Sequence, residues 1–383
     1  MNKFSFLLII TLTFLGCKNA DLLILNPNLE KELCESSYID KSQINDKYTV
    51  TTFIDSTIQN TSKKTLFDVL KKHEAESGFV MVMERKTGQI KAMTSFTNKN
   101  SAYIPSHIID ATIPIEPGSL IKTFDLMSLL EDKKATTSSI YNANGGEVFF
   151  YNQKIKDYQK GTNEMSLRNA FLTSSNTIFA QAIQDAYKEN PIQLMDNLNK
   201  FGLTADLDLP LNTSKNNSTL PNPKSDNWSK ITLPWMGIGY GLSLTPTQIL
   251  TYYNTIGNNG IMVQPLFLSK IISNEGSSKE YSTTILNNEI CSKATISTIQ
   301  DLLKIAVSTD SKKLQISGQA AEITLDYADQ NKSKKIASTF VGYFPRNNSE
   351  YTMMVYIKNP KKEVPNQINI AEKLFVNLVK KIK

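Results

Sequence analysis

The segment Glu116-Pro-Gly-Ser-Leu-Ile-Lys122 places a serine directly after a Pro-Gly turn and a lysine three residues later. The residues from Lys122 to Leu130 have a helical pattern, so Ser119 and Lys122 would lie one turn apart on the same face. A serine hydroxyl becomes a strong nucleophile when a neighbouring base takes its proton, and a lysine amine can be that base. The pair therefore predicts a Ser-Lys acyl-transfer site. The alternative for this motif alone is a capping serine followed by a solvated lysine.

A second polar segment, Leu172-Thr-Ser-Ser-Asn-Thr177, lies between two stretches of helical pattern. Its Ser174 hydroxyl and Asn176 amide flank Ser175, and such groups can hydrogen-bond both a lysine and a substrate amide. The alternative is a Ser-Asn turn that only caps the next helix.

A third segment, Gln315-Ile-Ser-Gly-Gln-Ala-Ala321, reads as part of a strand that contains Gly318. Glycine inside a strand often marks a place where a ligand or another backbone comes close. The alternative is a β-bulge.

Composition narrows the class of protein. The chain has 383 residues, a formal net charge of +6 and scattered Lys and Arg, which do not indicate a nucleic-acid interface. The two histidines, His73 and His107, are far apart in the sequence, and no Cys/His cluster has metal-ligand spacing. We therefore expect no histidine-based triad, no metal and no cofactor.

The N-terminus has the pattern of a bacterial export signal. A basic start is followed by the apolar run Phe4–Phe14 and then by Leu15-Gly16-Cys17. The run is too short to span a bilayer but suits the apolar region of a signal peptide, and a small residue before a cysteine resembles a lipobox. We expect cleavage before Cys17 and lipidation there, which would hold the protein on a membrane of the cell envelope, facing the periplasm or the exterior. The alternative is a plain secretory signal with an incidental cysteine.

With Cys17 lipidated, two cysteines remain, Cys34 and Cys291. One pair in a chain of this length is no disulfide framework, and whether the two meet stays open.

The periodicity of the remaining chain predicts an α+β fold in one domain over 48–383, after a signal peptide over 1–16 and a tether over 17–47. The expected elements are a strand over 49–54, a helix over 56–73 capped by Asp55, strands over 78–83 and 89–93, helices over 122–130, 165–171, 177–187, 191–201 and 245–256, strands over 314–324, 337–344 and 351–358, and a closing helix over 370–382. Strands at both ends of the domain would form one antiparallel sheet, flanked by helices, with a mainly helical middle.

From Tyr48 to its C-terminus the chain resembles the penicillin-binding proteins, in the transpeptidase domain of the serine β-lactamase/D,D-transpeptidase superfamily. The matching pieces occur in family order: Phe53–Gln59, Val82–Met93, Glu116–Lys122, Ser174–Asn176, Gly239–Gln248 and Phe340–Pro345. No pedestal domain is expected ahead of Tyr48.

The resemblance implies a role for each candidate residue. Ser119 would attack the penultimate D-alanine carbonyl of a peptidoglycan stem peptide, with Lys122 as its base. Ser174 would relay a proton to the leaving amine, and Asn176 would hold the substrate amide. A second stem peptide's amine would then resolve the acyl-enzyme and form a cross-link. β-Lactam antibiotics would acylate the same serine, and a glycan-polymerising protein is a possible partner.

The third motif departs from the family pattern of lysine, Thr or Ser, glycine, and Thr or Ser. We match it to Ile316, Ser317, Gly318 and Gln319, with the last three as substrate-binding residues and the N–H groups of Ser119 and Gln319 as the oxyanion hole. Isoleucine would then replace the lysine that attracts the substrate carboxylate and helps to keep Lys122 neutral, so Lys122 should stay protonated more readily.

Two lysines precede this motif, Lys312 and Lys313. On an extended strand Lys312 shares the face of Ile316 but lies about 13 Å away, and Lys313 faces the other side. Neither is expected to substitute for the missing lysine.

Three functions follow from these observations. The first is a D,D-transpeptidase that is a lipoprotein. The second is a catalytically degenerate relative that binds cell-wall peptide or a partner without turnover. The third and least favoured is a β-lactamase, because no acidic residue stands out as the base for the water that would release the acyl group.

Overall fold

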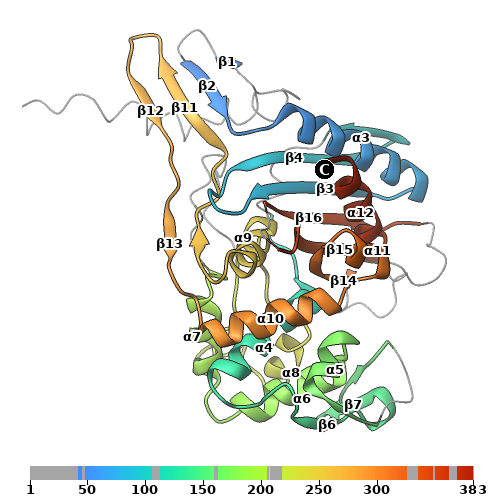
Figure 1. Ribbon diagram of the computed structural model, residues 1–383. Coiled ribbons are helices and arrows are strands. Elements are labelled where there is room, and N and C mark those ends of the chain that lie inside the picture. Colours follow the sequence, from blue (N-terminus) through green and yellow to red (C-terminus); the bar gives the residue numbers. More distant parts are fainter. Residues whose placement is uncertain are drawn as a thin grey trace, which may run out of the picture.

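The computed structural model describes residues 42–44, 48–105, 113–158, 163–204, 207, 218–325, 335–347, 350–361 and 369–382 (Figure 1). The predicted signal peptide, Cys17 with its lipidation, Cys34 and His107 lie outside the described residues.

A six-stranded antiparallel sheet forms the centre of the domain. Its order is β14-β15-β16-β3-β4-β5, so the two C-terminal hairpins lie beside the N-terminal one, as the sequence predicts. The strands are β3 (Ser77–Glu84), β4 (Ile90–Lys99), β5 (Ala102–Pro105), β14 (Ser317–Leu325), β15 (Lys335–Phe344) and β16 (Tyr351–Lys358). The register between β14 and β15 runs without a break from Ser317↔Tyr343 to Leu325↔Lys335.

Two helices, α3 (Ser56–His73) and α12 (Ile370–Ile382), pack side by side on one face of this sheet (Figure 1). Asp55 begins α3 by accepting hydrogen bonds from the Thr57 and Ile58 amides, both at 2.9 Å. This carboxylate satisfies amides that have no partner within the helix, which confirms the predicted cap. Apolar side chains of both helices and of the sheet form a core between them.

The other face is covered by the helical middle of the chain, which carries a larger core (Figure 1). The helices and short helical turns that follow β5 are η3 (Gly118–Leu120), α4 (Ile121–Glu131), η4 (Asn144–Gly146), α5 (Leu167–Leu172), α6 (Asn176–Tyr187), α7 (Pro191–Lys200), α8 (Thr232–Met236), α9 (Pro246–Gly257), α10 (Lys293–Ile305) and α11 (Thr309–Lys313). At α9, Thr245 and Gln248 form a capping box and proline occupies the first turn, so this predicted helix start is confirmed.

Small sheets complete the domain. A four-stranded sheet of order β1-β2-β11-β12 projects from one end (Figure 1), and three two-stranded ribbons lie elsewhere. Their strands are β1 (Ser42–Ile44), β2 (Tyr48–Thr52), β11 (Leu268–Ser273) and β12 (Ser278–Glu280), then β10 (Met262–Val263) with β13 (Ile285–Asn287), β6 (Ile140–Asn142) with β9 (Glu164–Ser166), and β7 (Glu147–Phe150) with β8 (Gln153–Lys156). Within the described part of the chain, no helix is both long and apolar enough to cross a bilayer.

The strand expected from residue 314 begins three residues late. Ser308 caps the short helix α11, and Gln315 then has a φ of 57°, which turns the chain before Ser317. Lys312 and Lys313 therefore lie on a helix, and the extended-strand argument about their faces was wrong.

Candidate active site

The turn that carries Ser119 is built by close backbone packing. Gly118, with a φ of 53°, precedes Ser119 in η3, and its amide donates to Gly239 O at 3.2 Å. A Cβ at Gly239 would overlap the Gly118 carbonyl, and φ at Gly239 is 85°, so only glycine fits there. The serine side chain makes no capping bond at the start of α4, which removes the capping interpretation of this motif.

The structure brings four predicted residues together around one amine. Lys122 Nζ lies 3.0 Å from Ser119 Oγ and 3.0 Å from Ser174 Oγ. It also lies 2.7 Å from Ser174 O and 2.7 Å from Asn176 Oδ1. A neutral amine can donate its two protons to these two carbonyl oxygens and keep its lone pair for a serine hydroxyl. The arrangement suits an amine that accepts the Ser119 proton.

Burial sets the protonation of this amine. The Lys122 side chain is fully buried, and the loss of solvation lowers its pKa to about 7, although the charges of Asp157 and Asp125 act in the opposite direction. The sequence predicted that Lys122 stays protonated more readily without a second cation nearby, and this comparison stays a prediction. Desolvation lowers the pKa of the Lys122 amine, which is the same direction in which a nearby positive charge would shift it.

A carboxylate holds the second motif in place. Ser174 has a φ of 55°, and Ser175 caps α6. Asp157 accepts hydrogen bonds from Ser175 Oγ at 2.8 Å, from the Thr177 amide at 2.8 Å and from Thr177 Oγ1 at 2.9 Å. Sequence reasoning missed Asp157, which lies 18 residues before Ser175 in an unremarkable polar stretch.

In the segment Gln315–Ala321, the residue whose side chain contacts Ser119 is Gln319, not Ile316 as expected. Gln319 Nε2 donates to Ser119 O at 2.9 Å, and Gln319 Oε1 accepts from Tyr253 OH at 2.8 Å and contacts Thr123 Oγ1. Gln319 is therefore the side chain of this segment that hydrogen-bonds to the turn carrying Ser119. Because it is neutral, the site still lacks a cation at this place.

The other residues matched to the third motif are all buried. Ile316 is fully buried in the core on the α3 and α12 face of the sheet. Ser317 is fully buried, and Gly318 packs so tightly on β15 that a Cβ would lie 2.8 Å from Gly342 Cα. The match of Ile316 to the family lysine was therefore wrong by three residues. Neither Ser317 nor Gly318 is placed to bind substrate.

The directions of the backbone amides along β14 also correct the prediction that the Gln319 amide belongs to the oxyanion hole. Backbone N–H groups alternate in direction along an antiparallel strand, and the Thr324 amide points out of the ladder to Tyr240 OH at 3.3 Å. Amides of even-numbered residues therefore point outward, and the Gln319 amide points into the ladder with β15. Gly118 lies against Ile323 and the Glu322 carbonyl. The amide of Glu322, which also points away from β15, therefore faces the turn that carries Ser119.

Among the described residues, no group of three or more His, Cys, Asp or Glu side chains could hold a metal ion. Cys291 is a buried free thiol, and Cys34 lies outside the described residues.

Ser119 on a helical turn, the buried Lys122 beside it and the flanking antiparallel strand β14 lie within a domain that matches known proteins. The family model of the penicillin-binding protein transpeptidase domain matches residues 78–380, and the chain belongs to this family.

Individual relatives agree with this assignment. The peptidoglycan D,D-transpeptidase FtsI of Buchnera aphidicola subsp. Baizongia pistaciae is 26% identical, over 86% of this chain and 57% of the relative. The probable peptidoglycan D,D-transpeptidase PbpC of Pseudomonas aeruginosa is 24% identical, over 81% of this chain and 54% of the relative. The chain thus spans about half the length of these curated relatives.

Solved structures support the fold. The transpeptidase domain of Burkholderia pseudomallei penicillin-binding protein 3 has a TM-score of 0.71 at 19% identity, covering 89% of this chain and 96% of that one. Penicillin-binding protein 3 of Mycobacterium tuberculosis, complexed with aztreonam, has a TM-score of 0.72 at 21% identity, covering 87% and 78%. The predicted α+β fold of this family is confirmed.

Proposed function

We propose that the chain is a peptidoglycan D,D-transpeptidase that forms an acyl-enzyme on Ser119. The observation that carries this proposal is the buried Lys122 amine, 3.0 Å from Ser119 Oγ, with a pKa of about 7. Relatives named D,D-transpeptidases support the substrate class, D-Ala-D-Ala stem peptides.

In the first half-reaction Ser119 Oγ gives its proton to Lys122 Nζ and bonds to the carbonyl carbon of the penultimate D-alanine. The carbon–nitrogen bond to the terminal D-alanine breaks, and the proton passes through Ser174 Oγ to the leaving amine. The amides of Ser119 and Glu322 stabilise the oxyanion. Asn176 keeps one amide hydrogen for a substrate carbonyl, since Lys156 O accepts the other at 3.0 Å.

Labelling with a fluorescent penicillin tests the proposal. The purified chain should become covalently labelled, and Ser119→Ala should abolish the label because the acylated oxygen is gone. Ser282→Ala is the control, because Ser282 is an exposed serine between β12 and β13, outside the segments that carry Ser119, Lys122, Ser174 and Asn176. An unlabelled native chain at high drug concentration, or a labelled Ser119→Ala, would contradict the proposal.

The rate of this labelling should depend on pH with a midpoint of about 7, the pKa of Lys122. Only the neutral amine can take the serine proton, so the rate falls about tenfold for each pH unit below the midpoint and is constant above it. Time courses of penicillin labelling at several pH values between 5 and 9 measure this profile. A midpoint near the ordinary lysine value would mean that Lys122 is not desolvated.

A second candidate is a degenerate domain that binds cell-wall peptide without turnover. It is favoured by one observation, the neutral Gln319 at the place where the strand reaches the nucleophile turn. Labelling without release of D-alanine from a D-Ala-D-Ala peptide would support this candidate.

We also propose that Cys17 is lipidated and anchors the domain in the cell envelope, where a glycan-polymerising partner would act with it. Gly16-Cys17 after an apolar run supports this proposal. Cys17→Ser should leave the precursor uncleaved and without lipid, as read by gel mobility. A variant that stays membrane-bound with unchanged processing would contradict the proposed lipid anchor.

A further inference from the structure

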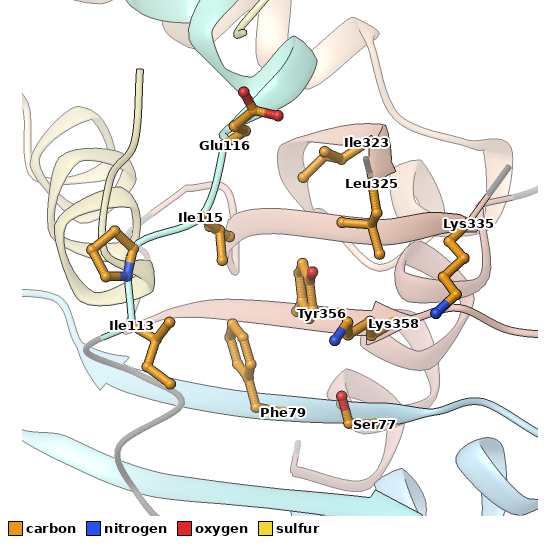
Figure 2. A pocket seen from close by; sticks show the side chains of 12 residues that line it. Ser77, Phe79, Ile113, Ile115, Glu116, Ile323, Leu325, Lys335, Tyr356 and Lys358 are labelled. Carbon is orange, nitrogen blue, oxygen red and sulfur yellow. The ribbon is translucent and has the colours of Figure 1, made fainter. Parts of the chain in front are cut away.

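A cavity of about 430 Å³ lies between the end of the central sheet and the chain segment 113–116 (Figure 2). Strands β14, β15, β16 and β3 form its floor, where Tyr356 is paired with Phe79. The volume is within the range of sites that bind small molecules. None of the described lining residues hydrogen-bonds to the Lys122 amine, so the cavity is separate from the acyl-transfer site.

The walls of this cavity are mainly apolar. The Phe79 and Tyr356 rings stack on each other in its floor, with centroids 5.1 Å apart and an interplanar angle of 9°. Ile113 and Ile115 project toward these rings from the segment above them, and Ile323 lines the cavity from β14 (Figure 2). Ile113 keeps 50% of its surface exposed. An apolar ligand would bury this surface, which is favourable in water.

One end of the cavity is cationic. Figure 2 shows Lys335, Lys358 and the Ser77 hydroxyl together at this end. Lys358 Nζ pairs with Glu76 Oε1 at 2.6 Å, and the charge of Lys335 acts on the same carboxylate. Two ammonium groups therefore share one carboxylate, and one positive charge is left to form charge-assisted hydrogen bonds with a ligand.

The opposite end of the cavity does not offset this charge. Glu116 lines that end, but its carboxylate points away from Phe79 and Tyr356 (Figure 2). Glu116 Oε1 accepts a hydrogen bond from the Gly241 amide at 3.2 Å, and Gly241 does not line this cavity. The cavity therefore suits a ligand that is apolar along most of its length and anionic at the end that meets the lysines.

We propose that this cavity binds a small apolar monocarboxylate. The body of the ligand would lie between Ile115 and the stacked rings of Phe79 and Tyr356. Its carboxylate would pair with Lys335 and accept a hydrogen bond from Ser77 Oγ. The inference goes beyond the proposed function, because binding at this place needs no acyl-enzyme and can be measured without turnover.

The test compares three probes that share one ring system: naphthoate, the uncharged naphthamide and the cationic naphthylmethylammonium ion. Isothermal titration calorimetry of the purified chain measures each dissociation constant. We expect naphthoate to bind about tenfold more tightly than naphthamide, because only the carboxylate forms charge-assisted hydrogen bonds with the lysine end. The cation should bind more weakly still. Equal affinities for the three probes, or no measurable binding of naphthoate, would overturn the inference.

Lys335→Met removes one ammonium group, so it should weaken naphthoate binding about fivefold and leave naphthamide binding unchanged. Lys64→Met is the matched control, because Lys64 is an exposed lysine on α3, on the opposite face of the sheet from the cavity. This control should bind naphthoate with the native affinity. An unchanged naphthoate affinity in Lys335→Met would contradict the proposed pairing.

Ser77→Trp tests the position of the site independently of charge. The larger side chain would fill the cavity from β3, so binding of naphthoate and of naphthamide should both be lost, with circular dichroism as the check of folding. Undiminished binding in a folded Ser77→Trp chain would mean that the probe binds elsewhere, which overturns the inference. A native chain that binds naphthoate but takes no penicillin label would contradict the proposed function and support this site.

Discussion

Replacing Lys122 with methionine should slow acylation of Ser119 about a thousandfold, the usual contribution of a positioned general base. Methionine fills a similar volume but has no lone pair at the position of Nζ, 3.0 Å from Ser119 Oγ. A time course of penicillin labelling measures the acylation rate. The variant should also lose the pH midpoint of about 7, because the titrating group is gone.

Lys134→Met is the matched control, since Lys134 is an exposed lysine just after α4 and contacts none of the site residues. It should label at the native rate. A Lys122→Met chain that labels within tenfold of the native rate, with the native pH profile, would show that another group takes the serine proton. Circular dichroism of both variants separates a chemical loss from unfolding.

Replacing Ile316 with lysine should lower the free energy of unfolding by about 3–5 kcal/mol, the usual effect of an unpaired buried charge. Ile316 is fully buried in the apolar core between the sheet and the helices α3 and α12. Denaturant unfolding followed by circular dichroism measures this loss. Penicillin labelling should not become faster.

Gln319→Lys introduces the same residue three positions later and is the informative contrast. Its ammonium would lie near Lys122, and like charges depress an amine's pKa, so the midpoint of the labelling profile should move below 7. The rate at pH 6 should rise, up to about tenfold. Faster labelling of Ile316→Lys with unchanged stability would restore the original match of the third motif.

Local signals predicted most of the fold. The bounds of β16 and α12 agree with the pattern over 351–358 and 370–382, because β-branched and apolar runs and a strong amphipathic period are sequence-local features. The helix over 56–73 was predicted from its Asp55 cap and apolar period, and both are present.

The register of β14 could not be predicted in the same way. Leu314, Gln315 and Ile316 alternate between apolar and polar, as residues of a strand do. In the structure Ser308 caps α11 and Gln315 has a positive φ that turns the chain, so the strand begins at Ser317. The prediction chose Ile316 because Ser317-Gly318 has the order of the family's Thr or Ser and glycine, but Ile316 lies in the core with α3 and α12, and Gln319 carries the side chain that contacts Ser119. The Gln319 amide, which was placed in the oxyanion hole, points into the ladder with β15.

The chemistry of the site depended on packing that no motif contains. Ser119, Lys122, Ser174 and Asn176 were predicted from two short segments, and the structure brings them together. The low pKa of Lys122 could not be predicted, because it results from burial by helices remote in the sequence. Asp157 was missed for the same reason, since only the folded chain brings it to Thr177.

The most direct test of the account is mass spectrometry of the chain during turnover of a peptide ending in D-Ala-D-Ala. We expect D-alanine to be released and a transient acyl adduct to appear on the proteolytic peptide that contains Ser119. An adduct on another residue, or penicillin labelling of Ser119 without any release of D-alanine, would contradict the claim that this site is a working transpeptidase.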